Sequence, residues 1–130
     1  KVDNRQYRLL KLATPGPYTF ILEATKEVPR RLSHPARKTI GLRVPENRIA
    51  HALLESLQQA VLGATLILPG AQEALTDSES IRAHLEKQVD LVIDGGACSL
   101  SPTTVLDLTG PEPSVLRLGR GALAHLGLSE

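Results

Sequence analysis

The sequence contains no methionine, only one cysteine (Cys98), and no apolar run of the length that spans a membrane. A single thiol excludes an internal disulfide framework and fits a reducing compartment, so we expect a cytoplasmic protein. A spanning helix needs about 18 or more apolar residues. Residues 1–13 are charged rather than signal-like, and we therefore expect no membrane partner. Because the chain starts at Lys1, the sequence leaves open that coding sequence lies upstream.

The sequence also has almost no net charge, because its basic and acidic side chains nearly balance. The formal net charge is +1, which is too small for an obligate nucleic-acid-binding domain, because such domains are usually strongly basic. Any RNA-binding surface must therefore be a local patch. A length of 130 residues is near the commonest single-domain size, so we expect one domain over residues 1–130.

The first half of the chain alternates between helical and strand patterns. Residues 4–12 predict a short helix, which the Thr14-Pro-Gly-Pro17 turn ends. Residues 18–24 and 39–44 have the period-2 apolar pattern of half-buried strands, and Arg43 falls on the polar side of the second. From Pro45 onwards the apolar residues have helical spacing, with Asn47 as an N-cap.

The second half predicts further strands around one more helix. Residues 61–68 are almost continuously apolar, which is typical of a central strand covered on both faces. Thr76-Asp-Ser-Glu79 fits a capping box that starts a helix, and residues 91–93 predict a short strand. Residues 103–108 and 114–118 predict an antiparallel hairpin. The order predicts an α/β fold with a mixed, twisted sheet and covering helices.

A basic, proline-broken segment at residues 26–38 lies between the first two strands and reads as a surface turn or short helix. Its side chains include Arg30, Arg31, Arg37 and Lys38, which we take as candidate RNA-binding residues. Phosphate contacts by such side chains supply sequence-independent affinity. A solvated surface without a ligand is the alternative.

Metal and nucleophile chemistry have little support in the sequence. The four histidines lie far apart without zinc-ligand spacing, and Cys98 has no neighbouring base, so we predict no metal site and no thiol catalysis. Asp90, Asp94 and Asp107 have the hard oxygen ligands that suit Mg²⁺ beside phosphates, although such residues more often cap turns. No Walker or dinucleotide-binding motif occurs.

Two segments carry a family resemblance: Thr14-Pro-Gly-Pro-Tyr-Thr-Phe-Ile-Leu-Glu23, and Lys38-Thr-Ile-Gly-Leu-Arg-Val-Pro45. In order and spacing they resemble the YrdC/YciO family, and the Ile67-Leu-Pro-Gly70 ending favours the YciO branch. The family includes threonylcarbamoyl-adenylate synthases, which join L-threonine, bicarbonate and ATP in the biosynthesis of a modified tRNA adenosine. The resemblance implies a YrdC-like fold truncated at its N-terminus, with ATP and Mg²⁺ as the cofactors to consider.

The resemblance also implies a nucleotide-binding set. Arg43 matches the family's Arg-x-Pro, Arg117 matches its Arg-x-Gly, and Thr103-Thr104-Val105 matches a segment whose hydroxyls face the nucleotide. Thr65 matches the last residue of a hydroxyl triplet. Arginine forks suit phosphate oxygens and hydroxyls suit a triphosphate or ribose. From the residues alone, the alternatives are solvated arginines and ordinary strand threonines.

The chain departs from the family pattern at two places. Gly63-Ala64 replaces two hydroxyl residues of the triplet, and residues 1–13 lack the family's Thr-Asp and Lys/Arg motifs. We therefore expect a nucleotide- or RNA-binding domain, for tRNA or double-stranded RNA, without catalytic activity of its own. The alternatives are an inactive oligomeric relative and an active synthase whose missing motifs lie upstream or in a partner. Because truncation exposes a sheet edge, we expect a homo-oligomer, most simply a dimer.

Overall fold

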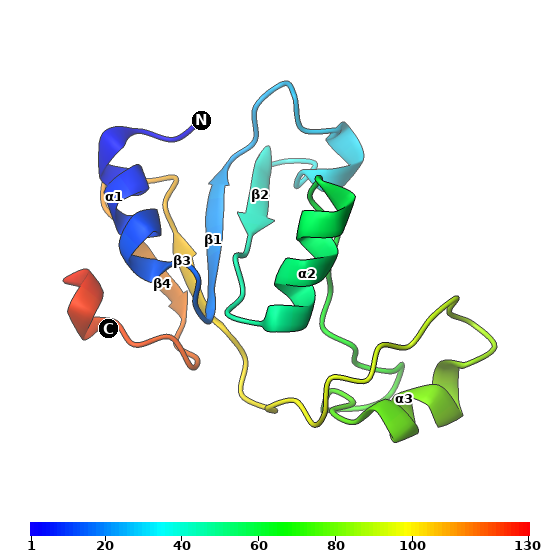
Figure 1. Cartoon of the computed structure of the whole chain (residues 1–130). Helices are drawn as coiled ribbons and strands as arrows, with labels where there is room; N and C mark the ends of the chain where they lie inside the picture. Colours follow the sequence, from blue (N-terminus) through cyan, green and yellow to red (C-terminus); the bar gives the residue numbers. More distant parts are fainter. The chain divides into compact units, whose positions relative to one another are not determined.

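Figure 1 shows the fold, a computed structural model that describes all of residues 1–130. The α-helices are α1 (Asn4–Ala13), α2 (Arg48–Leu57) and α3 (Ser78–Leu85), and the strands are β1 (Tyr18–Glu23), β2 (Thr39–Leu42), β3 (Thr104–Asp107) and β4 (Ser114–Arg117). Two short 3₁₀ turns, η1 (Arg30–Leu32) and η2 (Ala124–Leu126), complete the elements. None of the helices combines the length and apolar character needed to cross a membrane.

The four strands form one mixed sheet in the order β2-β1-β3-β4. β1 pairs with β3 in parallel, whereas β2 and β4 are antiparallel to their neighbours. Phe20 lies opposite Leu42 on one side and Leu106 on the other. The mixed α/β sheet and the final antiparallel hairpin are therefore confirmed.

One face of the sheet forms the core of the molecule. Tyr18, Phe20 and Leu22 alternate along β1 and are buried, as the period-2 pattern predicted. Leu106 of β3 joins them, and Leu9 on α1 packs against the same cluster. Leu123 and Leu126 near the C-terminus extend the cluster. Helix α1 and the C-terminal turn thus cover this face, and the face carrying the intervening residues is a separate surface.

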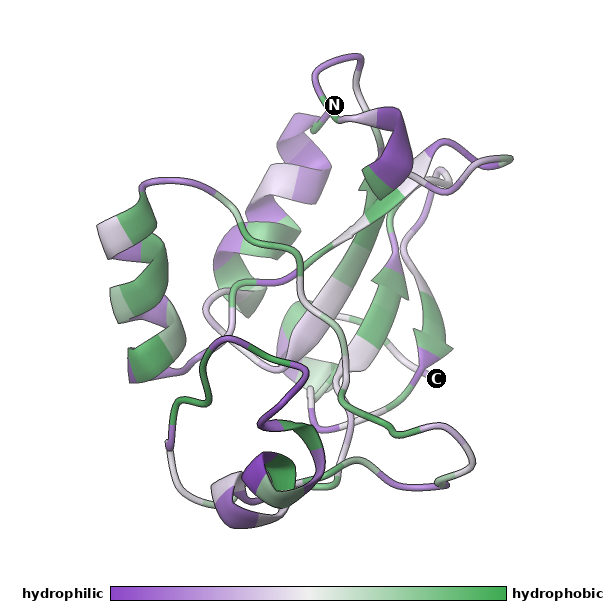
Figure 2. Ribbon diagram, turned by 90° about the vertical axis from the view of Figure 1, so that its right-hand side faces the viewer, coloured by the Kyte–Doolittle hydropathy of each residue, from purple (hydrophilic) through white to green (hydrophobic).

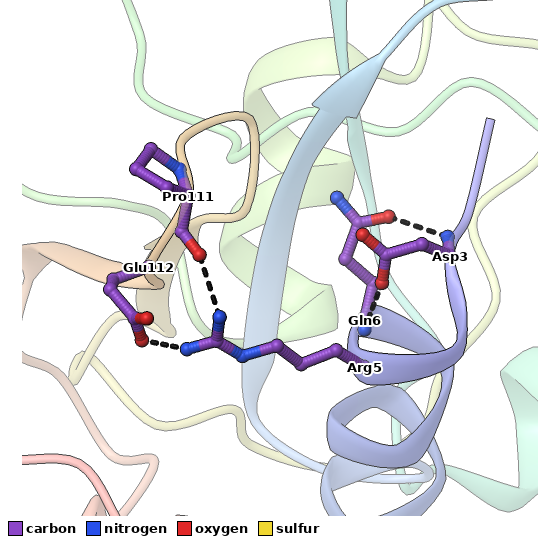
Figure 3. A network of polar contacts seen from close by, with 5 residues as sticks. All are labelled: Asp3, Arg5, Gln6, Pro111 and Glu112. Atoms are coloured by element: carbon purple, nitrogen blue, oxygen red, sulfur yellow. Dashed lines mark hydrogen bonds and ion pairs between the residues drawn. The ribbon is translucent and has the colours of Figure 1, made fainter.

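Polar contacts fix helix α1 to the loop between β3 and β4 (Figure 3). Asp3 and Gln6 form a capping box, in which the Asp3 side chain accepts from the Gln6 amide at 2.8 Å. Arg5 donates to the Pro111 carbonyl at 2.8 Å and forms an ion pair with Glu112. These contacts hold the beginning of the helix in register with the hairpin.

The chain divides into two compact units. Unit 1 contains residues 1–47 and 102–130, with the whole sheet, α1 and both 3₁₀ turns, and unit 2 contains residues 48–101, with α2 and α3. Every buried residue belongs to unit 1, and unit 2 has only half-buried and exposed residues. One domain over residues 1–130 stays a prediction.

Two strand predictions are wrong, and both fall in unit 2. Residues 61–68 and 91–93 adopt irregular backbone, and most of their apolar side chains are exposed. Figure 2 shows hydrophobic colour along irregular stretches as well as along strands. A strand exists only when a neighbouring strand takes up its hydrogen bonds, and no segment of the chain does so here. The predicted cap of the following helix is one residue early, because Asp77 rather than Thr76 caps α3.

Candidate functional site

The second face of the sheet, opposite α1, carries the residues that lie between the core positions. Thr19 and Ile21 of β1 and Val105 and Asp107 of β3 occupy it, and all four are half-buried. Side chains alternate between faces along a strand, so these positions share one side. Most of the predicted nucleotide-binding residues of unit 1 lie on or beside this face.

Arg117, at the end of β4, binds the main chain of Thr103. Its Nε and Nη2 donate to the Thr103 carbonyl at 3.1 and 2.9 Å, and Nη2 also approaches the Thr103 hydroxyl at 3.2 Å. The Nη1 atom makes no hydrogen bond in the protein. The guanidinium is therefore held in one orientation while part of its donor fork remains open to a ligand.

Thr19 completes this arrangement from the neighbouring strand. Its hydroxyl lies 2.9 Å from the hydroxyl of Thr103, so Thr19, Thr103 and Arg117 form one contact network, which we call the Thr-Arg cluster. Sequence reasoning brought together Thr103 and Arg117 and missed Thr19. The available signal was the alternation of Tyr18 and Phe20, which assigns Thr19 to the opposite face.

Arg43 extends the same row toward the other edge of the sheet. The antiparallel register ends with Leu42 opposite Phe20, and Arg43 is the first residue after β2, at the Thr19 end of β1. Gly41 precedes it on the same face, where an added Cβ would lie 3.6 Å from the side chains of Ile21 and Thr19. Arg43 is exposed and has no hydrogen bond or ion pair, so its whole guanidinium is available to an anion.

Thr104 occupies a different environment from Thr103. It is fully buried, and its hydroxyl donates to the Gly121 carbonyl at 2.7 Å and accepts from the Gly119 amide at 3.0 Å. A Cβ at Gly119 would collide with the Pro102 carbonyl, which explains the glycine of the Arg-x-Gly segment. Thr104 therefore holds the loop after β4 against β3, and its hydroxyl faces the protein rather than the second face.

Tyr18, on the core face of β1, contacts the same C-terminal region after β4. Its hydroxyl donates to the Ala122 carbonyl at 2.6 Å and lies 3.3 Å from Nε2 of His125. Burial raises the pKa of the Tyr18 phenol, because the phenolate would lose its hydration. The phenol is accordingly a neutral structural donor.

Thr65, the remaining nucleotide-binding candidate, lies in unit 2. It is exposed, and its carbonyl accepts from the Ile67 amide at 3.1 Å. The Thr-Arg cluster and Arg43 belong to unit 1. Participation of Thr65 in the same site stays a prediction.

The basic segment forms the connection between β1 and β2, and Arg30, Arg31, Arg37 and Lys38 are all exposed there without ion pairs. His34 organises the segment, since its Nδ1 accepts from the amides of Ala36 and Arg37 at 3.3 and 3.1 Å. The connection closes where the Ala24 amide donates to the Lys38 carbonyl at 2.8 Å. The four cations therefore share one ordered loop, and their binding role stays a prediction.

The acidic candidates do not converge. No group of three or more histidine, cysteine or acidic side chains could hold a metal ion. Oδ1 of Asp107 accepts from the Thr109 amide and hydroxyl at 2.9 and 2.6 Å. Two hydrogen bonds lower the pKa of Asp94. The larger effect comes from the Gly96 amide and the smaller one from the Ser78 side chain. Mg²⁺ carried in with a nucleotide stays an expectation of the resemblance.

A cavity of about 290 Å³ lies on the core side of unit 1, between α1, the β3–β4 loop and the C-terminal residues 126–128. It is lined by leucines, including Leu9 and Leu108, with Arg5 and Arg8 among its charged residues. None of the predicted site residues contributes to it.

Comparison with known proteins adds a family assignment. Residues 1–119 match the family model Sua5_yciO_yrdC, described as telomere recombination. The chain is 57% identical over 120 residues to the uncharacterized protein YciO of Escherichia coli, covering 92% of this chain and 58% of that protein. It is 31% identical over 113 residues to the threonylcarbamoyl-AMP synthase of Homo sapiens, covering 79% of this chain and 38% of the synthase.

Solved structures agree with these matches. The crystal structure of E. coli YciO superposes with a TM-score of 0.88 at 54% identity, covering 96% of this chain and 61% of that one. The crystal structure of P. abyssi Sua5 complexed with L-threonine gives a TM-score of 0.79 at 26% identity, covering 92% of this chain and 35% of that one. The chain thus spans little more than half the length of YciO.

Proposed function

The chain belongs to the Sua5/YciO/YrdC family, and on that basis we propose that it is a nucleotide-binding domain whose phosphate contacts come from Arg117 and Arg43. The observation that carries the proposal is the row of Arg43, Thr19, Thr103 and Arg117 across the second face of the sheet. The family's relation to threonylcarbamoyl-adenylate synthesis makes ATP the first nucleotide to test.

The chemistry of the row suits a polyphosphate. Arg43 offers an unpaired guanidinium and Arg117 offers its open Nη1, so the same face of the sheet carries two permanent positive charges for an anionic ligand. The hydroxyls of Thr19 and Thr103 add groups that both donate and accept, which suits phosphate oxygens or a ribose.

We expect no catalysis by this chain alone. Gly63 and Ala64 lack the hydroxyls of the family triplet, and the chain covers only 58% of the length of YciO. Phosphoryl and acyl chemistry loses most of its rate when the reacting groups are not held together. We expect no pyrophosphate release above background on incubation with threonine, bicarbonate and ATP.

The binding test uses Arg43→Ala, because Arg43 is exposed and has no hydrogen bond or ion pair that the substitution would break. ATP titration by calorimetry or NMR should show at least about tenfold weaker binding, given that a hydrogen bond to a charged group contributes roughly 1.5–3 kcal/mol. The matched control is Arg8→Ala, an exposed and unpaired arginine on α1. Equal ATP affinity of the wild type and Arg43→Ala would contradict the proposal.

A second candidate function is RNA binding by the loop between β1 and β2. The observation that favours it is the group of Arg30, Arg31, Arg37 and Lys38, four exposed cations without ion pairs on an ordered loop. Each neutralised phosphate should steepen the salt dependence, by about 0.7–0.9 in the slope of log affinity against log salt. Replacing Arg30, Arg31 and Arg37 with alanine should flatten that slope. An unchanged slope would show that these side chains do not contact RNA phosphates and form only a solvated surface.

We also propose that the isolated chain self-associates, with a dimer as the simplest form. The supporting observation is that unit 2 has no buried residue, so its apolar side chains remain open to another surface. Large exposed apolar patches on stable proteins usually mark such contacts.

A further inference from the structure

The cavity between α1, the β3–β4 loop and residues 126–128, which we call the α1 pocket, has an apolar floor. Its volume of about 290 Å³ is near the lower end of the range of small-molecule sites, which is roughly 300–1,000 Å³. Leu9, Leu108 and Leu126 line it, and each is at most 9% exposed. The lining contains no aromatic side chain, so the pocket suits an aliphatic body rather than a stacked ring.

The C-terminal wall of the α1 pocket is held by the turn that ends η2. Gly127 has a φ of 70°, a left-handed conformation that glycine adopts without steric cost. The amides of Gly127 and Leu128 donate to the carbonyls of Ala124 and Leu123 at 3.0 and 3.2 Å. Leu128 thereby packs against the core cluster and lines the pocket, so this wall is already formed without a ligand.

Most of the polar side chains in the lining are bound to other parts of the protein. Arg5 forms an ion pair with Glu112 across the rim (Figure 3). Asp3 and Gln6 are joined in the capping box of α1. Arg8 is the exception, because it is exposed and has no hydrogen bond or ion pair. Its guanidinium is therefore the lining charge whose donors are open to a ligand.

The charges of the lining also limit what the ligand can carry. Asp3 and Glu112 are acidic, and they balance Arg5 and Arg8. A single negative charge can pair with Arg8, whereas a polyphosphate would also meet the two carboxylates and be repelled by them. The α1 pocket therefore suits a monoanion and disfavours ATP, so Arg8→Ala remains a valid control for the ATP titration.

We propose that the α1 pocket binds a medium-chain aliphatic monocarboxylate, with its chain among the leucines and its carboxylate on Arg8. The planar guanidinium matches a carboxylate with two parallel hydrogen bonds. The leucines take the alkyl chain out of water. The pocket lies on the core side of the sheet, and none of its lining residues belongs to the Thr-Arg cluster, so this inference does not depend on nucleotide binding.

The test is a titration of the full chain with octanoate, followed by NMR. We expect saturable shifts in α1 and in residues 108–113 and 126–128, the segments that line the pocket. Hexanoate should bind at least about tenfold more weakly, because each buried methylene group contributes roughly a factor of four in affinity. Octanol should also bind at least about tenfold more weakly, because it lacks the charge that pairs with Arg8.

Point variants test the two parts of the site separately. Arg8→Ala should weaken octanoate binding at least about tenfold, whereas Lys11→Ala, which removes an exposed cation of the same helix outside the lining, should not. Leu12 lines the pocket and is 64% exposed, so Leu12→Glu should fold normally and repel the carboxylate. Its matched control is Leu116→Glu on β4, where the leucine is 58% exposed.

Three results would overturn the proposal. The first is equal octanoate affinity of the wild type and Arg8→Ala. The second is a set of shifts confined to the exposed apolar side chains of unit 2, which would mean unspecific binding. The third is a pocket whose signals respond to protein concentration and not to octanoate, which would make it a contact between copies of the chain. Arg43→Ala should leave octanoate binding unchanged, so the nucleotide proposal can fail independently.

Discussion

At the scale of single residues, Thr103 and Thr104 show how one step along a strand changes a side chain's role. The hydroxyl of Thr103 meets Thr19 and Arg117 at the second face. The hydroxyl of Thr104 points into the protein, between the Gly119 amide and the Gly121 carbonyl. Two neighbouring threonines therefore serve a candidate binding surface and the loop that shapes it.

Thr104→Val should destabilise the protein, because valine keeps the shape of threonine and removes its hydroxyl. The Gly119 amide and the Gly121 carbonyl would then lose a partner in the interior, which costs about 1–3 kcal/mol for each unsatisfied group. Urea unfolding measures the difference. Thr39→Val is the matched control, since the Thr39 hydroxyl on β2 makes no hydrogen bond. Equal losses in both variants would show that the Thr104 hydroxyl has no special role.

At the scale of elements, helices α1 and α3 each have an aspartate as the N-cap residue. Asp3 caps α1 and Asp77 caps α3, each accepting a backbone amide three residues on. Hydrogen bonds from Ser80 lower the pKa of Asp77 below its ordinary value. The backbone amide of Ser80 has the larger effect and its side chain the smaller. Because the ionised cap is favoured in the folded state, its contribution is present above the ordinary pKa and is lost as pH falls through the lowered one.

Helix α3 should therefore fray in acid. NMR chemical shifts of residues 78–85 should move toward unfolded values as pH falls below the ordinary range of an aspartate. Asp77→Asn is the control, because asparagine caps helices without titrating and leaves Glu79 in place. An equal acid response in Asp77→Asn would assign the effect to another carboxylate.

At the scale of the whole molecule, burial is concentrated in one of two units. Unit 1 contains the sheet and every buried side chain, from Leu9 on α1 to Leu126 in η2. Unit 2 contains two helices joined by long irregular stretches and no buried residue. Unit 1 therefore has a core of its own, whereas unit 2 lacks one.

The isolated chain should therefore be larger than a monomer in solution. Light scattering across a dilution series should give at least twice the 14.0 kDa chain mass, because self-association would cover the exposed apolar side chains of unit 2. Leu62→Asp should shift the protein toward the monomer, and Leu116→Asp should not. A stable 14.0 kDa species at micromolar concentration would contradict this expectation.

The sequence by itself determined the elements whose signal is local. The Pro-Gly-Pro turn ends α1, and the alternation of Tyr18, Phe20 and Leu22 places one face of β1 in the core, because both depend on neighbouring residues. The final hairpin and the mixed sheet also followed from local patterns and their order. Family motifs in the sequence singled out Arg43, Thr103 and Arg117.

Only the tertiary structure decided what depends on distant partners. It brought Thr19 to Thr103 across 84 positions of sequence and assigned the Thr104 hydroxyl to the loop after β4. It also left residues 61–68 without a strand, although their composition is that of one. A strand's hydrogen bonds belong to its neighbours, so apolar patterning predicts the capacity to pair and cannot supply the partner.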